Sequence, residues 1–130
     1  SNDNSNLMHC LHSAYMLQCL VASTRKHPVP VPADFLGYGT TGGASLLGRA
    51  DIGRLAPGMA ADLFAIDTRR MDYVGTRNDP LSLLPRVGIG MATDMTMING
   101  RIVWQDVAFP GLDEAKLAAD AEAALATVEF

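Results

Sequence analysis

The chain has 130 residues, of which 48% are hydrophobic and 18% are charged, and its formal net charge is −4. This composition is typical of a globular domain that buries a hydrophobic core, and it excludes a disordered chain. The negative charge gives no reason to expect nucleic acid or an anionic membrane as a partner, no apolar run is long enough for a transmembrane helix, and no signal peptide is recognisable.

Residues 1–6 form a polar run ahead of a helical pattern over 7–24. Ser5 or Asn6 is suited to cap this helix. Because the chain has no initiator methionine, we interpret the polar run as a loop cut in the middle and the chain as a piece of a larger protein. Apolar residues recur at steps of three and four around much of the helix, which predicts packing on more than one side.

The two cysteines, Cys10 and Cys19, both lie in this helix. Their spacing places them on roughly opposite helix faces, which disfavours a disulfide between them. Reduced, buried thiols are typical of a protein kept in a reducing compartment. We therefore predict two buried free thiols and a cytoplasmic protein.

A proline-rich connector over 28–32 ends the first helix, because each proline disfavours helix in the residue before it. A second helix is predicted over about 33–47, and the glycines within it weaken it. The pair Gly42-Gly43 is expected to allow a close helix approach or to separate two short helices. These glycines do not form a phosphate-binding loop, because the GxxxxGK[ST] pattern and a preceding strand are both missing.

The pair Pro57-Gly58 predicts a type II turn that leads into an apolar strand over 62–67. After a polar stretch, an Asp-Pro pair begins a short helix near 80–84. Pro85 is expected to end that helix.

Two alternating apolar runs, 95–98 and 101–106, flank Asn99-Gly100. This arrangement predicts a β-hairpin, since both turn residues tolerate positive φ. Asp113 is suited to cap a last helix that runs to about 128. Because this helix is rich in alanine, we expect it to pack closely on the rest of the chain as a terminal strap.

Several motifs, in their order and spacing, resemble the C-terminal third of a metal-dependent amidohydrolase. They are Thr41-Gly42-Gly43-Ala44, Leu47-Gly48-Arg49, a GxLxPGxxADL motif from Gly53 to Leu63, Asp79-Pro80, and an NGRxVxxD motif from Asn99 to Asp106. The resemblance covers essentially the whole chain and is greatest to the group of chlorohydrolases, hydroxyatrazine hydrolases and 8-oxoguanine or guanine deaminases. The combination is specific, whereas either of the two longer motifs alone would be a weak signal.

The resemblance implies an α+β fragment of a larger fold, which combines a (β/α)8 barrel with a small β-sandwich. Residues 1–50 would be terminal helices of an incomplete barrel. Residues 51–110 would be the C-terminal part of the sandwich, with the short helix near 80–84, and residues 111–130 would form the C-terminal helix. A strand followed by a hairpin is too little sheet to stand alone, so this reading also requires partner strands.

The implied chemistry is hydrolysis of C–N or C–Cl bonds of a small heteroaromatic substrate, by a water that zinc or iron activates. The family's metal ligands are an HxH pair, two further histidines and an aspartate. None of them maps onto this chain, so we predict no catalytic residue, no metal ligand and no activity for the chain alone. Only Ser1 and Asn2 correspond to the family's active-site loop. Asp3 follows them and is not the metal-binding aspartate.

Two local alternatives remain. His9 and His12 share a helix face and could hold a metal with a third ligand, but surface or interface histidines are the favoured interpretation. A group of aromatic side chains is interpreted as sandwich core and not as a stacking platform. It comprises Phe64, Tyr73, Trp104 and Phe109.

A second hypothesis is a self-contained structural or oligomerisation module without catalysis. Unpaired sheet edges invite strand addition. We therefore expect the isolated chain to self-associate through the strands around 95–106 or to bind the missing N-terminal part. Neither nucleic acid nor a membrane is an expected partner.

Overall fold

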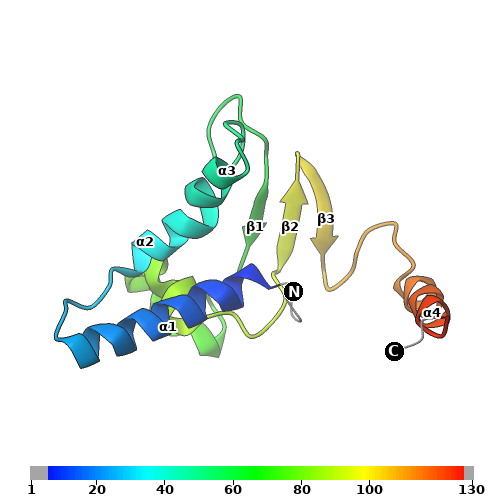
Figure 1. The fold of residues 1–130 in the computed structure, drawn as a ribbon. Coiled ribbons are helices and arrows are strands. Elements are labelled where there is room, and N and C mark those ends of the chain that lie inside the picture. Colours follow the sequence, from blue (N-terminus) through cyan, green and yellow to red (C-terminus); the bar gives the residue numbers. More distant parts are fainter. Residues whose placement is uncertain (1–5, 128–130) are drawn as a thin grey trace.

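A computed structural model describes residues 6–127 of the chain. Its helices and strands, in chain order, are α1 (Leu7–Arg25), α2 (Pro32–Gly37), α3 (Gly43–Leu46), β1 (Leu63–Ala65), β2 (Met95–Ile98), β3 (Arg101–Gln105) and α4 (Glu114–Leu125). Helices α1 to α3 gather on the β1 side of the sheet, and α4 lies beyond β3 (Figure 1). The described residues are therefore an α+β arrangement, as predicted. None of the described helices combines the length and hydrophobicity needed to span a membrane.

Helix α1 begins and ends close to its predicted limits. The side-chain oxygen of Asn6 accepts hydrogen bonds from the backbone N–H groups of Met8 and His9, which confirms the predicted cap. Only Tyr15 and Ala22 are buried on this helix. Packing on more than one side is therefore wrong for the described residues, because α1 contacts α2 and the segment around Pro85 and leaves a second apolar row exposed.

The predicted second helix is one nearly continuous helical run. A π-helical turn, Tyr38–Gly42, joins α2 to α3, so the glycine-rich stretch widens the helix and does not break it. Phe35 is the buried anchor of this run. Its ring packs edge-on against Tyr15 at a centroid distance of 5.4 Å, an arrangement that aromatic pairs favour.

The Pro-Gly turn forms as predicted. The N–H of Met59 donates to the carbonyl of Ala56 at 3.1 Å, and Gly58 has a φ of +82°. Gly53, also at positive φ, lies directly against the helical run. A Cβ atom there would be 2.9 Å from the Cβ of Ala44 and 3.0 Å from the carbonyl oxygen of Thr40.

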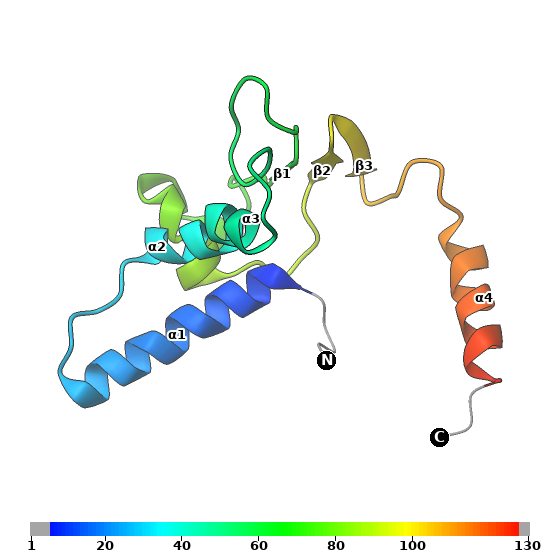
Figure 2. The ribbon, with the colours of Figure 1, turned by 45° about the horizontal axis from the view of Figure 1, so that its top comes forward.

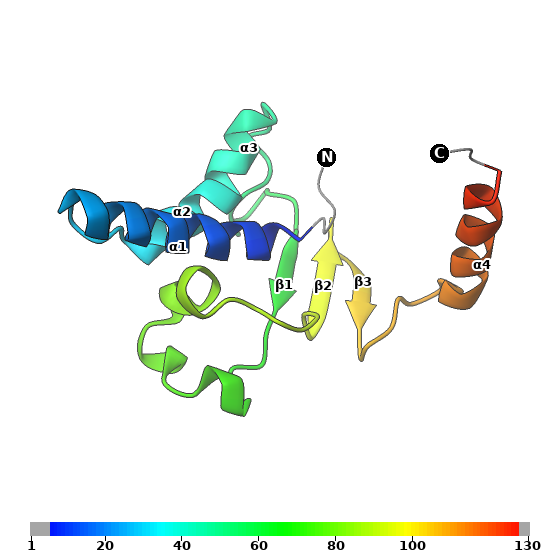
Figure 3. The same cartoon turned by 60° about the horizontal axis from the view of Figure 1, so that its bottom comes forward.

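The three strands form one antiparallel sheet in the order β1-β2-β3 (Figure 3). The predicted strand over 62–67 is shorter than expected, and β3 ends one residue early. Asn99 and Gly100 have φ values of +49° and +77°, which confirms the predicted hairpin turn. This is the type I′ geometry that matches the twist of paired strands.

A second tight turn follows β3 and was not predicted. The backbone N–H groups of Gln105 and Ala108 donate to each other's carbonyls at 3.0 and 3.1 Å. Asp106 and Val107 lie between them with φ values of +53° and +61°. This is again the positive-φ geometry of a two-residue hairpin. Val107 is β-branched, and such residues rarely adopt a positive φ.

The short helix near 80–84 is longer than predicted. A 3₁₀ turn, Pro80–Ser82, continues into a π-helical turn, Leu83–Val87, that contains Pro85. The prediction that Pro85 ends the helix is therefore wrong. Pro85 lies in the first turn of that segment, where backbone N–H groups lack helical acceptors, so its missing N–H costs little.

The C-terminal helix forms but does not pack. The carboxylate of Asp113 accepts from the N–H of Lys116 at 3.0 Å, which confirms the predicted cap. No residue of α4 is buried, and the helix stands apart at the end of a long connection (Figure 2). The prediction of a closely packed strap is wrong. Alanine side chains bury little apolar area, so packing offers little to offset the entropy of docking.

The buried core lies among the helical elements and not on the sheet. Tyr15, Phe35, Tyr73, Leu83 and Ile89 are buried there. The segment between β1 and β2 therefore packs with α1 and α2, and the sheet side chains remain partly exposed.

Candidate functional site

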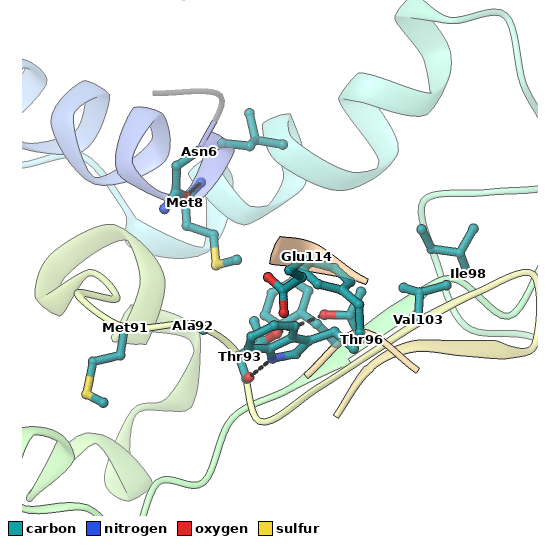
Figure 4. Close-up of a pocket in the computed structure, with 13 residues that line it drawn as sticks. Asn6, Met8, Met91, Ala92, Thr93, Thr96, Ile98, Val103 and Glu114 are labelled. Carbon is teal, nitrogen blue, oxygen red and sulfur yellow. Dashed lines mark hydrogen bonds between the residues drawn. The ribbon is translucent and has the colours of Figure 1, made fainter. Parts of the chain in front are cut away.

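A hollow lies between the start of α1 and one face of the sheet. Its volume is about 720 Å³, and we call it the sheet hollow. Its walls come from residues 6–8, from 91–93 in the loop before β2, from all three strands, and from Phe109 and Glu114 beyond β3. Figure 4 shows Asn6 and Met8 facing the strand residues Thr96 and Val103 across it.

The strand register creates the aromatic wall of this hollow. Phe64 of β1 lies opposite Thr96 of β2, which lies opposite Trp104 of β3. Directly opposed residues share one face of an antiparallel sheet. The indole N–H of Trp104 donates to the carbonyl of Thr93 at 2.6 Å, so the ring is held in one orientation.

The unpredicted turn after β3 returns the chain to the same wall. It brings Phe109 against Trp104, with ring centroids 4.7 Å apart. The predicted aromatic group is thus only partly assembled. Phe64 and Phe109 join Trp104 in the sheet hollow but remain 42% and 39% exposed, whereas Tyr73 is buried and does not line it.

His9 and His12 hold the segment after β1 onto α1. The Nε2 atom of His9 lies 3.1 Å from the carbonyl oxygen of Ile89, and the Nδ1 atom of His12 lies 2.9 Å from that of Pro85. Because a carbonyl oxygen only accepts, both of these ring nitrogens carry the proton. The pair therefore binds backbone, and within residues 6–127 no three His, Cys, Asp or Glu side chains are grouped to hold a metal ion.

The two thiols are free, as predicted, but their predicted burial is wrong. Cys10 is exposed and Cys19 is half-buried. The reason is the second face of α1, which no described residue covers. Burial raises the pKa of the neighbouring Tyr15 phenol, and a hydrogen bond with the Cys19 side chain adds to this shift.

Carboxylates tie the ends of the sheet to its flanking loops. Asp94 accepts from the backbone N–H of Asp67 at 2.6 Å and from the guanidinium of Arg70 at 2.5 Å. Hydrogen bonds from the Arg69 side chain and backbone lower the pKa of Asp67. Asp62 accepts from the N–H of Asn99 at 2.7 Å and thereby fixes the hairpin turn against β1. These groups have structural partners and do not form a paired-acid site.

The predicted remnant of an active-site loop, Ser1 and Asn2, lies outside the described residues. Sequence reasoning did not identify the sheet hollow. Its walls come from segments that are far apart in the sequence, and the residues from α1 and the loop before β2 carry no motif. Only the aromatic strand residues gave a signal that could have indicated it.

Comparisons with known proteins show which family and which proteins this chain resembles. A model of the amidohydrolase family matches residues 1–103. The chain is 55% identical over 122 residues to hydroxydechloroatrazine ethylaminohydrolase of Pseudomonas sp. strain ADP, and the match covers 94% of this chain and 25% of that protein. It is 40% identical over 124 residues to 8-oxoguanine deaminase of Pseudomonas aeruginosa, covering 95% of this chain and 26% of the relative.

Among solved structures, atrazine chlorohydrolase TrzN from Arthrobacter aurescens TC1, complexed with zinc, matches with a TM-score of 0.81 at 26% identity. That match covers 95% of this chain and 27% of the other. The chain therefore spans about a quarter of the length of the proteins that it matches.

Proposed function

This chain belongs to the amidohydrolase family, and we propose on that premise that it is the C-terminal portion of a metal-dependent hydrolase. The whole protein would act on C–N or C–Cl bonds of a small heteroaromatic substrate, replacing an amino group or a chloride by water. The observation that carries this proposal is the 55% identity to a hydroxydechloroatrazine ethylaminohydrolase. An aminohydrolase or deaminase reaction is therefore the favoured activity.

The metal of this proposal is zinc or iron, held upstream of the 130 residues. The described side chains do not fit such a site. His9 and His12 bind two different backbone carbonyls, and no group of three ligand side chains is present within residues 6–127. Because structural and catalytic sites take three or four protein ligands, the chain alone is proposed to be inactive and to bind no metal.

In the proposed parent fold, α1 follows the last strand of a (β/α)8 barrel, and β1 to β3 are the C-terminal part of a β-sandwich. Residues 1–50, 51–110 and 111–130 would then be barrel helices, sandwich and terminal helix. Ser1 and Asn2 would be the remnant of the active-site loop. The likeness to TrzN supports this arrangement. Free thiols are typical of proteins in a reducing compartment, which supports a cytoplasmic location.

The test joins this chain to the upstream part of the Pseudomonas ethylaminohydrolase. The joined protein is expected to release amine or chloride from triazine or guanine-type substrates and to contain metal. The 130-residue chain is the control and should do neither. Hydrolysis by the control, or one tightly bound metal ion per control chain, would contradict the proposal.

A structural or oligomerisation module is the second candidate, because β1 and β3 both form sheet edges and several sheet side chains are exposed. It would self-associate through the β2–β3 hairpin, as unpaired edges favour. Light scattering of the isolated chain tests this. A monomer at all accessible concentrations would rule out self-association, and activity of the joined protein would favour the hydrolase.

A further inference from the structure

The turn of the β2–β3 hairpin has a sequence that is suited to intramolecular deamidation. The backbone nitrogen that follows an asparagine can attack the Cγ atom of its side chain, and asparagine is accordingly among the thermolabile residues. Glycine lacks a Cβ atom and leaves that nitrogen unhindered. Asn99 is the only asparagine of the chain that is followed by glycine, and Asn99 and Gly100 are both exposed to water.

The side chain of Asn99 is not restrained by the described part of the chain. Among residues 6–127 its amide group has no hydrogen-bond partner, because the hydrogen bond of this residue is made by its backbone N–H. The side chain can therefore rotate toward the nitrogen of Gly100. The leaving group of a deamidation, the Nδ2 atom, is held by no described residue.

The backbone of the turn, in contrast, is held from the side of β1. The N–H of Gly100 donates to the carbonyl of Ala61 at 3.1 Å, and the N–H of Asn99 donates to the carboxylate of Asp62 at 2.7 Å. The attack requires that the Gly100 nitrogen lose its proton and that the turn rotate. The first hydrogen bond engages that proton, and the second fixes the positive-φ backbone of the turn. We call Ala61 and Asp62 the turn clamp.

The turn clamp lies at a part of the sheet that can open locally. It directly precedes β1, a strand of three residues that pairs with β2 at the edge of the sheet. Asp62 is exposed. Segments with few buried contacts and exposed hydrogen bonds open at a lower free energy than the core. Movement of this end of β1 would release both N–H groups of the turn while the helical core stays folded.

We propose that Asn99-Gly100 is a self-modification site, which the turn clamp closes in the folded chain and which local opening of β1 exposes. The Gly100 nitrogen gives its proton to a solvent base and forms a bond to Cγ of Asn99. The bond from Cγ to Nδ2 breaks, and Nδ2 takes up a proton and leaves as ammonia. A water molecule then opens the succinimide ring at either carbonyl and leaves aspartate or isoaspartate at position 99.

The product weakens the contact that had closed the site. Either product places a carboxylate beside that of Asp62, and like charges repel each other. Isoaspartate also lengthens the backbone of the turn, whose geometry sets the register of the hairpin. A modified chain is therefore expected to open more readily at β1 than an unmodified one, and it does not revert.

The experiment incubates the 130-residue chain in mildly alkaline buffer, with and without urea, and follows the peptide that contains Asn99 by mass spectrometry. Deamidation of Asn99 should be at least about tenfold faster in urea than in the folded chain. Asn78, which precedes Asp79, is the internal reference and should keep its amide under both conditions. Equal rates at Asn99 with and without urea would overturn the proposal, and an intact Asn99 in urea would overturn the site itself.

Three variants test the turn clamp. Asp62→Ala should raise the rate in the folded chain by about fivefold or more and leave the rate in urea unchanged, because it removes a charged acceptor that acts only in the fold. Asp62→Asn keeps an acceptor oxygen and should give an intermediate rate. Asp67→Ala is the matched control. Its carboxylate lies beyond the other end of β1 and binds Arg69, so the rate at Asn99 should change by less than about twofold.

Hydrogen exchange shows where Asp62→Ala opens the chain. Exchange at the Gly100 amide should accelerate by a factor similar to that of deamidation, while the amides of α1 keep their protection. A rate in Asp62→Ala equal to that of the unsubstituted chain would overturn the turn clamp. None of these readouts measures hydrolysis of a substrate, so the inference does not depend on the proposed function.

Discussion

The imidazole of His12 donates from Nδ1 to the carbonyl oxygen of Pro85 at 2.9 Å, across 73 positions of sequence. One turn earlier on the same helix, His9 donates from Nε2 to Ile89 at 3.1 Å. Both acceptors belong to the segment that carries the buried Pro85 and Ile89. The two histidines, whose spacing could suit a partial metal site, therefore form the hydrogen bonds that join α1 to the core.

Removing the hydrogen bond of His12 should destabilise the fold. His12→Ala leaves the Pro85 carbonyl without its donor and is expected to lower the free energy of unfolding by about 1–2 kcal/mol. His12→Asn keeps a side-chain N–H near the position of Nδ1 and should lose less. Urea unfolding of both variants measures this. Equal losses in the two variants would show that the hydrogen bond is unimportant.

Gly53 and Gly58 separate backbone strain from crowding. Both have positive φ, so alanine at either position should cost about 1 kcal/mol of stability. Only at Gly53 would the new Cβ meet the rigid neighbours Ala44 and Thr40, whereas the space around Gly58 is open. Gly53→Ala is therefore expected to cost about 1–3 kcal/mol more than Gly58→Ala. Thermal or urea unfolding of the two variants gives the difference in stability. Similar stability losses in both would show that crowding at Gly53 is unimportant.

Val107 occupies a backbone conformation that suits glycine. Its φ is +61°, and its side chain is mostly exposed, so little packing offsets the strain. Val107→Gly should raise the free energy of unfolding by about 0.5–1 kcal/mol. Val74→Gly is the control. Val74 is also exposed but has a φ of −57°, so the same change there should destabilise. Stability losses of similar size in both variants would show that the backbone of Val107 is not strained.

Tyr15 should make the fold sensitive to alkali. Its burial raises the pKa of the phenol in the folded chain, and the hydrogen bond with Cys19 acts in the same direction. Above about pH 10 the unfolded chain loses this proton before the folded chain does. The unfolded state then binds fewer protons, so stability falls as the pH rises. Below that pH the group makes no pH-dependent contribution.

Tyr15→Phe is expected to remove this part of the alkaline loss. Tyr38→Phe is the control, because Tyr38 is exposed. Circular dichroism during unfolding at pH 8 to about 11 follows both variants. If Tyr15→Phe loses stability as steeply as the unsubstituted chain, the phenol is not the cause.

The features that the sequence predicted correctly depend on a few neighbouring residues. The Asn6 and Asp113 caps, the Pro-Gly turn and the Asn-Gly hairpin are each decided within about four positions, where side-chain hydrogen bonds and allowed φ values act directly. The structure agrees with all four.

The wrong predictions concern features that depend on contacts between residues far apart in the sequence. Pro85 was expected to end a helix, but it lies in a turn that α1 buries. Cys10 follows a convincing apolar pattern, yet the face that carries it is uncovered. The C-terminal helix has the right cap and no packing partner. Local chemistry specifies that a helix forms, whereas burial depends on which other surface is present.

The candidate site was even less predictable. The sheet hollow joins Met8 to Trp104, which lie 96 positions apart in the sequence. Its shape also depends on the turn at Asp106 and Val107, whose composition is not that of a typical type I′ turn. The family resemblance depended on motif order and did not require any of this geometry. The match of residues 1–103 to the amidohydrolase family confirms it.

Trp104 is the single tryptophan of the chain, and its indole forms part of the wall of the sheet hollow. The emission spectrum of an indole depends on how much water surrounds it. The intrinsic fluorescence of this protein therefore reports on one surface and not on an average over many. Covering the hollow should shift that emission to shorter wavelength, so the molecule carries its own optical probe of this surface.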